Sequence, residues 1–375
     1  MVIAAVAGFF YMRERIQASS IGDFYSFNRE AGSLPYVIDH SKAVFAQGSY
    51  TLAPGLRATV GARYTWEDKS INLTAYNTTL STGLPQGTPF VANVKDNFNA
   101  FTPKFGVDYQ VNPNAMIYAS VTRGFKSGGF NYAAKAANQV SFDPETIWSY
   151  EAGLKSDWLD HRLRFNLTGF IYNYANLQVQ SVLAPGVVNI SNAANAKVKG
   201  LEVELIAKPV DGLTLSSNMS FLDAKYSSFP CAPIPNGLVG TVTATNIASC
   251  TPAGTSTINA AGFTLNYAPR FSTLEALQYD IPASFGTITA RAEYSWQSTS
   301  YFDATNSILL SQKGYGLFNL ALGWRSNDKA WQAQVLVRNV GDKQYINSGS
   351  AQGFPPGGRA GAPRTVSFTI SRKFN

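Results

Sequence analysis

The sequence has few charged residues and no long apolar segment. Asp, Glu, Lys and Arg make up 14% of its 375 residues, against about 25% in ordinary soluble domains. No apolar run reaches about 18 residues, which excludes a transmembrane helix. The net charge of +7 is spread along the chain. We interpret it as an ordinary solvated surface, with an anion-attracting channel as the alternative. Without a basic cluster, the sequence does not predict nucleic-acid binding.

Residues with the spacing of a catalytic or metal site are also lacking. His40 and His161 are the two histidines, and neither has a cysteine or carboxylate at ligand spacing. Glu202 and Glu204 share one side of a predicted strand, where paired carboxylates are more often ion-pair partners of arginines, such as Arg162 and Arg164, than acid–base catalysts. We therefore expect no enzymatic activity, no cofactor and no resident metal.

Cysteine is scarce as well. Cys231 and Cys250 are the two cysteines, and both lie in one segment rich in Pro, Gly and Thr. In an oxidising compartment they would close that segment with a disulfide, whereas in the cytosol they would be free thiols. Their shared segment favours the disulfide.

What the sequence does contain is a regular alternation of apolar and polar residues. In residues 103–131, apolar side chains occupy every second position on both sides of the turn formers Asn112, Pro113 and Asn114. A period of two predicts β-strands, and the intervening turn predicts an antiparallel hairpin. A glycine-rich loop follows the second arm.

The same unit recurs to the end of the chain and predicts about fourteen strands. Short turns at one end alternate with long loops, rich in Gly, Asn, Ser and Thr, at the other. The predicted strands are 2–15, 43–52, 56–69, the two arms of 103–131, 146–158, 161–174, 199–208, 213–222, 268–279, 285–297, 315–325, 331–340 and 364–375.

This organisation is typical of an outer-membrane β-barrel, which crosses the bilayer with strands of about 9 to 11 residues and has long loops on one side only. One face of each strand is apolar and almost free of charge away from its ends. An Arg or Lys at the bilayer centre would cost about 2–4 kcal/mol there. Aromatic residues gather near strand ends, where an interfacial girdle is expected: Tyr64, Trp66, Trp148, Trp158, Trp296, Trp324 and Trp331. The predicted fold class is therefore all-β, an antiparallel transmembrane β-barrel.

Four segments resemble the C-terminal barrel of TonB-dependent outer-membrane receptors, in the order of that family. They are YASVTRGFKSGGFN (118–131), ETIWSYEAGL (145–154), VRNVGDKQY (337–345) and GAPRTVSFTISRKF (361–374). The resemblance covers essentially all of residues 1–375, as one partial barrel domain. Family members have a barrel of about 22 strands, a signal peptide, a segment that contacts TonB, and a plug. The resemblance implies that about fourteen of these strands are present and that the signal peptide, TonB-contacting segment and plug are not.

The resemblance also implies a function in the outer membrane of a Gram-negative bacterium. Members of the family take up a scarce nutrient, often a ferric siderophore, with energy supplied through TonB. The implied partners are outer-membrane lipid, the barrel-assembly machinery during biogenesis, TonB through parts outside this chain, and an extracellular small molecule. The alternative is a passive diffusion channel formed by a complete barrel of about fourteen strands.

Two groups of side chains are candidates for ligand recognition. Loop aromatics could contact the ligand, or could merely pack the loops together: Tyr76, Phe130, Tyr132, Tyr226, Phe229, Tyr301, Phe302 and Phe354. Charged side chains of the lumen could guide an anionic chelate, or could pair with one another: Arg63, Arg162, Arg164, Glu202, Glu204, Arg291 and Arg338.

The final strand carries a pattern of its own. Val366, Phe368, Ile370 and Phe374 alternate with small polar residues and lie close to the C-terminus. This pattern resembles the signal that the barrel-assembly machinery reads, although Arg372 interrupts the apolar row. The alternative is an ordinary edge strand.

Overall fold

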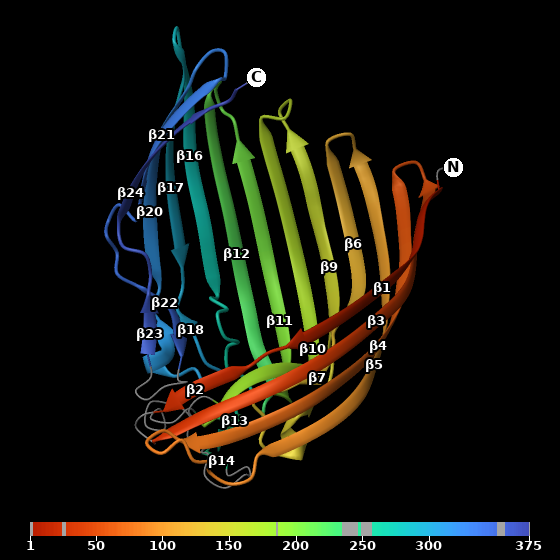
Figure 1. Cartoon of the computed structure of the whole chain (residues 1–375). Coiled ribbons are helices and arrows are strands. Elements are labelled where there is room, and N and C mark those ends of the chain that lie inside the picture. Colours follow the sequence, from red (N-terminus) through yellow and green to blue (C-terminus); the bar gives the residue numbers. More distant parts are fainter. Residues whose placement is uncertain are drawn as a thin grey trace.

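One antiparallel sheet dominates the computed structural model, which describes residues 3–24, 28–184, 187–234, 247–248, 257–350 and 357–374. Figure 1 shows its strands side by side in chain order. The sheet runs through β1 (Ile3–Gln17), β3 (Arg29–Ala53), β4 (Leu56–Thr79), β5 (Phe90–Asn112), β6 (Ala115–Lys126), β9 (Glu145–Trp158), β10 (Leu163–Ala184), β11 (Val187–Ala207), β12 (Leu213–Ser228), β16 (Phe271–Ala283), β17 (Gly286–Gln297), β20 (Tyr315–Arg325), β21 (Trp331–Arg338) and β24 (Thr365–Arg372).

Shorter elements lie in the long connections, at the lower end of the molecule in Figure 1. They are β2 (Ser20–Phe24), which pairs with β3, and the small pairings of β7 (Gly129–Phe130) with β8 (Ser141–Phe142), β15 (Thr257–Ile258) with β13 (Ala232–Pro233) and β14 (Ile247–Ala248), β18 (Ser300–Tyr301) with β19 (Ser311–Gln312), and β22 (Ile346–Ser350) with β23 (Gly357–Ala360). Within the described ranges, no helix is long and apolar enough to cross a membrane.

All fourteen strands expected from the alternation are confirmed, but several are longer than expected. Strands β3, β4 and β5 contain 25, 24 and 23 residues, and β10 and β11 contain 22 and 21. The residues taken as polar loops before 43 and after 69 are strand extensions. Beyond residue 69 the apolar residues of β4 change sides: Ile71, Leu73 and Ala75 alternate with polar residues and are buried on the concave face. The expected strand ends early because the expectation rests on the lipid-facing row alone.

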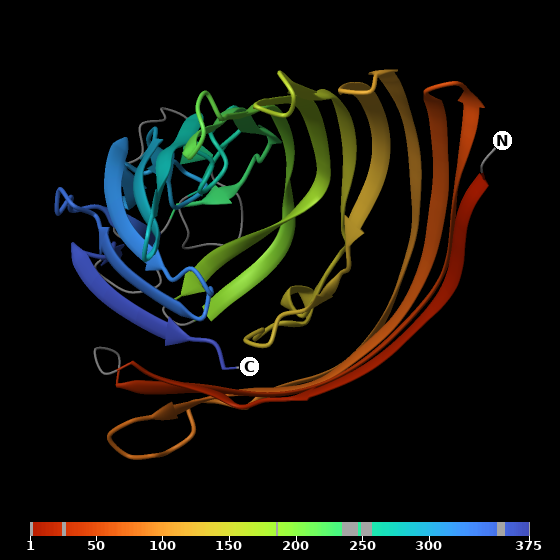
Figure 2. The ribbon, with the colours of Figure 1, turned by 90° about the horizontal axis from the view of Figure 1, so that it is seen from above.

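The sheet bends into an incomplete ring, as the view in Figure 2 shows. Each strand pairs with its neighbour along the chain, and β1 and β24 form the two edges. Among the described residues, no pairing joins these two strands to each other. The arrangement is therefore a large section of a barrel wall rather than a closed barrel.

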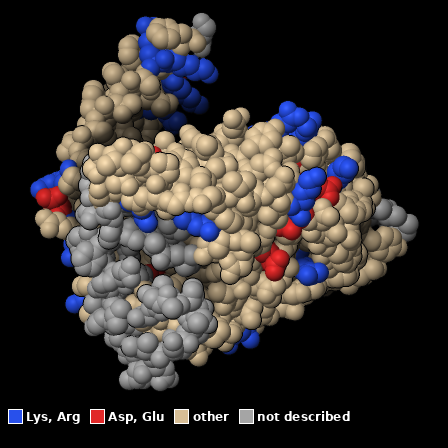
Figure 3. Space-filling view, turned by 60° about the horizontal axis from the view of Figure 1, so that its bottom comes forward, with Lys and Arg blue, Asp and Glu red and all other residues tan. Residues whose placement is uncertain are grey.

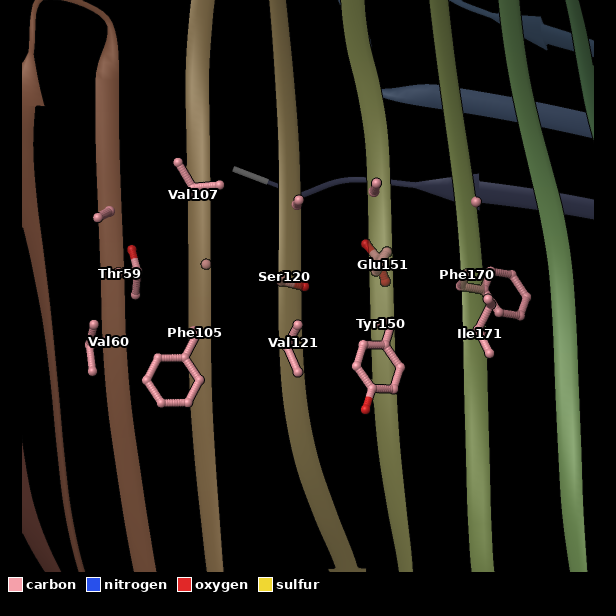
Figure 4. A pocket seen from close by; sticks show the side chains of 15 residues that line it. Thr59, Val60, Phe105, Val107, Ser120, Val121, Tyr150, Glu151, Phe170 and Ile171 are labelled. Atoms are coloured by element: carbon pink, nitrogen blue, oxygen red, sulfur yellow. The ribbon is translucent and has the colours of Figure 1, made fainter.

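The outer face of this wall carries the predicted apolar rows. Val60, Phe105, Val121, Tyr150 and Ile171 are partners in register across five adjacent strands, and Figure 4 shows them in a row. The next row contains the small residues Ala119, Ala152 and Gly169, and an open depression of about 790 Å³ lies here. This hollow faces lipid and is an unevenness of the apolar face, not a ligand site.

A single carboxyl group interrupts the apolar face of β16. Glu275 is the register partner of Tyr294 and lies on the same face as the exposed Leu277, two residues further along the strand. The hydroxyl of Ser217 donates a hydrogen bond to Glu275 Oε1 over 2.9 Å, and Thr273 donates to the same oxygen. Hydroxyl donors on the same face thus offset part of the cost of placing this group beside lipid.

Candidate ligand-binding site

A cavity of about 570 Å³ lies on the concave side of the wall, at the end with the long connections. Its lining comes from the extensions of β10, β11 and β12 and from the connections that follow β12, β17 and β21. This volume lies within the range of about 300–1,000 Å³ that is usual for small-molecule sites. The long connections therefore form a ligand-sized space.

Aromatic side chains form one wall of this cavity. The rings of Tyr226 and Phe229 lie 5.3 Å apart, and those of Tyr267 and Phe302 lie 5.2 Å apart. Phe229 is 1% exposed, and it belongs to a buried cluster with Val179 and residues of three separate connections. Three predicted contact residues, Tyr226, Phe229 and Phe302, are thus brought together. Each packs the connections against one another and also lines the cavity.

The other predicted aromatic contacts lie elsewhere. Phe130 belongs to a second buried cluster, where the connection between β6 and β9 covers the concave face of β3 and β4. Tyr132 is exposed nearby. Tyr76 is in the extension of β4 rather than a loop, and its ring lies over Gly32. Tyr301 is in β18, next to the cavity residue Phe302. Phe354 lies outside the described residues.

Polar side chains that the sequence analysis missed hold the connections in place. Asp303 accepts hydrogen bonds from the backbone N–H groups of Thr305 and Ser307, over 3.2 and 3.0 Å. Asn306 bonds the backbone of Thr264 through both ends of its amide, over 2.9 and 2.8 Å. The run of residues 303–307, Asp-Ala-Thr-Asn-Ser, is typical of such turns and could have been recognised. Burial raises the pKa of Asp303, and these hydrogen bonds partly offset that effect.

Two further polar residues connect the β6–β9 connection to the cavity. The backbone N–H of Gln178 donates to Glu145 Oε2 over 2.8 Å, and the Gln178 side chain donates to the carbonyl of Ser127 over 2.8 Å. Asn131 exchanges hydrogen bonds with the backbone of Ile190, over 2.7 and 2.9 Å. The connection between β6 and β9 is therefore bonded to the extensions of β10 and β11.

Most of the predicted lumen arginines are engaged by other groups. Arg164 pairs with Asp157 at 2.9 Å, and Arg291 pairs with Glu293 at 2.7 Å. Arg63 donates to Thr65 and lies 5.2 Å from the centroid of the Phe10 ring.

Two arginines lie at or just beyond the ends of their strands. Arg162 is in the turn before β10 rather than on the wall, and it pairs with Asp211 of the next turn at 3.4 Å. The prediction that it lines the lumen is wrong because β10 begins one residue later. Arg338 is exposed at the last position of β21.

Glu202 and Glu204 line a depression of about 590 Å³ on the concave face, together with Lys155 and Asn166. Asn166 donates to Glu204 Oε2 over 2.7 Å. The expected pairing of these glutamates with Arg162 and Arg164 is wrong, because both arginines have aspartate partners closer to the turns.

Residues 3–340 match the family model described as TonB dependent receptor-like, beta-barrel. The chain belongs to this family of TonB-dependent receptor β-barrels. It is therefore part of an outer-membrane protein, and its family consists of receptors and transporters rather than enzymes.

Individual relatives of this TonB-dependent receptor chain match parts of it. The metal-pseudopaline receptor CntO of Pseudomonas aeruginosa is 33% identical over 129 residues, which cover 34% of this chain and 17% of that protein. The ferric-pyoverdine M114 receptor PbuA of Pseudomonas sp. is 25% identical over 278 residues, which cover 73% of this chain and 29% of that protein.

Among solved structures, the ferric yersiniabactin uptake receptor FyuA from Yersinia pestis aligns with a TM-score of 0.78 at 19% identity, over 100% of this chain and 51% of that one. The ferric-catecholate import receptor Fiu from E. coli K12, in its closed form, aligns with a TM-score of 0.68 at 16% identity, over 99% of this chain and 55% of that one. The present chain thus spans about half the length of these receptors, and the likeness shows the fold.

The cysteine pairing predicts a simple measurement on this receptor chain. Cys231 is disulfide-bonded in the structure, and Cys250 lies outside the described residues. Mass spectrometry of unreduced, protease-digested outer membranes is expected to find the peptides of Cys231 and Cys250 linked, because the cell envelope is oxidising. Detection of either residue as a free thiol in fresh membranes would contradict the pairing.

The final strand of the receptor barrel is exposed along one side. Val366, Phe368 and Ile370 are all more than half exposed on β24, and Phe374 follows beyond its end. The guanidinium of Arg372 lies 5.0 Å from the centroid of the Trp331 ring and 4.9 Å from that of Phe374. Stacking between two rings explains how this arginine fits into the apolar row. Recognition by the assembly machinery remains a prediction.

Proposed function

We propose that the protein containing this chain imports a ferric siderophore or a similar chelate across the outer membrane, with energy supplied through TonB. The observation that carries this proposal is the cavity at the long-loop end, where Tyr226, Phe229 and Phe302 meet from separate segments. Aromatic walls exclude water from a bound ligand, and a few polar groups fix its orientation. Residues 1–375 would form one partial barrel domain of this importer.

The names of the relatives support this choice of ligand. The two curated relatives are receptors for metal-pseudopaline and for ferric-pyoverdine, and the two solved structures are receptors for ferric yersiniabactin and ferric catecholates. The further partners that we propose are outer-membrane lipid along the apolar face, the barrel-assembly machinery for β24, TonB, and an extracellular chelate.

The alternative of a passive channel finds no support. A channel of fourteen strands would require β1 to pair with β24, and no such pairing occurs among the described residues. The family match, in addition, is to receptors.

Uptake of radioactive iron would test the proposed function. Iron-starved cells of the source bacterium should accumulate iron from a panel of ferric chelates, and disruption of the gene should abolish accumulation of at least one of them. A protonophore should abolish the same uptake, because TonB-dependent import requires energy. Uptake that persists with the protonophore and rises in proportion to concentration would instead indicate passive diffusion.

A further inference from the structure

The cavity at the long-loop end contains negative but no positive side chains. Glu145 and Asp303 are its only charged lining residues, and no Lys or Arg of the described chain lines it. Its other polar groups are amides such as Gln180 and Asn266, together with tyrosine hydroxyls. The cavity can therefore donate hydrogen bonds, but it offers no formal positive charge to a ligand.

The two segments that supply most of the lining add no cation, and Lys313, Lys343 and Arg359 of the other two connections are not among the lining residues. Residues 226–269, which span the end of β12 and the whole connection to β16, contain no Asp, Glu, Lys, Arg or His. Residues 165–196, which include the connection between β10 and β11, contain none either. Whatever conformation these segments adopt on binding, they bring no charge to a ligand.

Strand alternation directs the nearest lysines of β11 and β12 away from the cavity. Val198 and Tyr226 are buried on the concave side and line it. Lys197, Lys199 and Lys225 occupy intervening positions and are exposed on the opposite side, where Lys225 pairs with Asp223 at 3.0 Å. In Figure 3, which brings this end of the molecule forward, uncharged side chains cover most of the coloured surface.

Ligand charge decides whether such a cavity is favourable. An anion that enters it loses hydration and gains no opposite charge in return, and juxtaposition with like charges is strongly unfavourable. An uncharged complex loses little hydration free energy on entering the cavity. A protonated amine is attracted to the carboxylates of Glu145 and Asp303. We propose that this site selects an uncharged or cationic ferric chelate, such as a trihydroxamate with a free amine, and rejects a polyanionic one such as a tricatecholate. This selectivity rests on the proposed function, and it replaces the expectation that lumen arginines guide an anionic chelate.

Three ferric complexes provide the test. They are a linear trihydroxamate with a protonated amine (a monocation), a cyclic trihydroxamate (uncharged) and a tricatecholate (a trianion). Binding is measured by fluorescence quenching on outer membranes that contain the full-length receptor, with membranes of the disrupted strain as the blank. We expect the tricatecholate to bind at least about 10-fold more weakly than either hydroxamate. Equal or stronger binding of the tricatecholate would overturn the proposed selectivity and leave the importer function standing. Binding of none of the three would overturn both.

A charge introduced into the cavity distinguishes an effect of the cavity's electrostatics on binding from an effect of ligand shape. Gln180→Lys adds a cation to the lining, and we expect it to strengthen tricatecholate binding by roughly 3- to 10-fold and to weaken binding of the monocation. Asn173→Lys is the matched control, because Asn173 is exposed on the same strand but on the outer face, in register with Lys197. Equal effects of the two variants would overturn the proposal, since the charge of the cavity would then not determine selection.

Discussion

Replacement of Ala290 by Arg is expected to prevent insertion of the barrel, whereas replacement of the adjacent Thr289 by Arg is expected to be tolerated. Ala290 is the register partner of Leu322 and Tyr279, which are 57% and 42% exposed on the outer face. An arginine here would face lipid, at a cost of about 2–4 kcal/mol near the bilayer centre. Thr289 is on the concave side and donates to Asp280 over 2.7 Å, so an arginine there gains a carboxylate neighbour.

The measurement is the amount of heat-modifiable protein in outer-membrane fractions. Folded barrels migrate differently before and after heating, so the assay reports assembly directly. We expect the Ala290→Arg band to be nearly absent and the Thr289→Arg band to approach that of the unaltered protein. Equal amounts of the two variants would show that the assignment of faces on β17 is incorrect.

Replacement of Phe229 by Ala is expected to destroy the ligand cavity without preventing barrel assembly. The ring is 1% exposed and lies at the centre of the cluster that joins three connections. Removing a buried aromatic ring typically costs about 3–5 kcal/mol, which is more than a cluster of loops can lose and remain ordered. We expect loss of chelate binding and faster proteolysis within residues 229–269, with heat modification unchanged.

Leu309→Ala provides the control for this variant. Leu309 belongs to the neighbouring turn but is 58% exposed, and substitutions at such positions usually change stability by about 0.5 kcal/mol or less. Retained chelate binding in Phe229→Ala would show that the aromatic cluster is not part of the ligand site. Loss of binding in both variants would show that the effect is not specific to the cluster.

The sequence predicted the wall of the barrel well because lipid imposes a strict rule. Positions such as Val60 and Phe105 must be apolar and their neighbours need not be, so alternation reveals both the strands and their faces. The rule does not apply outside the bilayer, where Ile71 and Leu73 of β4 are buried on the concave side instead, and the extensions of β3, β4 and β5 were therefore taken as loops. It also does not reveal an exception such as Glu275, because the two hydroxyl groups that bond it come from β12 and from β16 itself.

The candidate site was only partly predictable. Tyr226, Phe229 and Phe302 were chosen individually as aromatic residues of long connections, and nothing in their spacing indicated that they meet. Phe130 satisfied the same criterion and yet packs into a different cluster. Contacts within a short segment were easier to predict than contacts between distant segments. The sequence from Asp303 onward is typical of a turn, whereas the hydrogen bond between Glu145 and the backbone of Gln178 joins residues 33 positions apart.

The length of the strands sets how far the proposed ligand cavity can lie beyond the bilayer. A strand of 25 residues, such as β3, extends over about 80 Å, whereas the hydrocarbon core of a bilayer is about 30 Å thick. Much of the wall therefore projects into the external medium as continuous hydrogen-bonded sheet. The cavity lies at the end of the wall that carries the long connections. In the importer that we propose, a chelate would therefore be bound at this projecting rim before it reaches the bilayer.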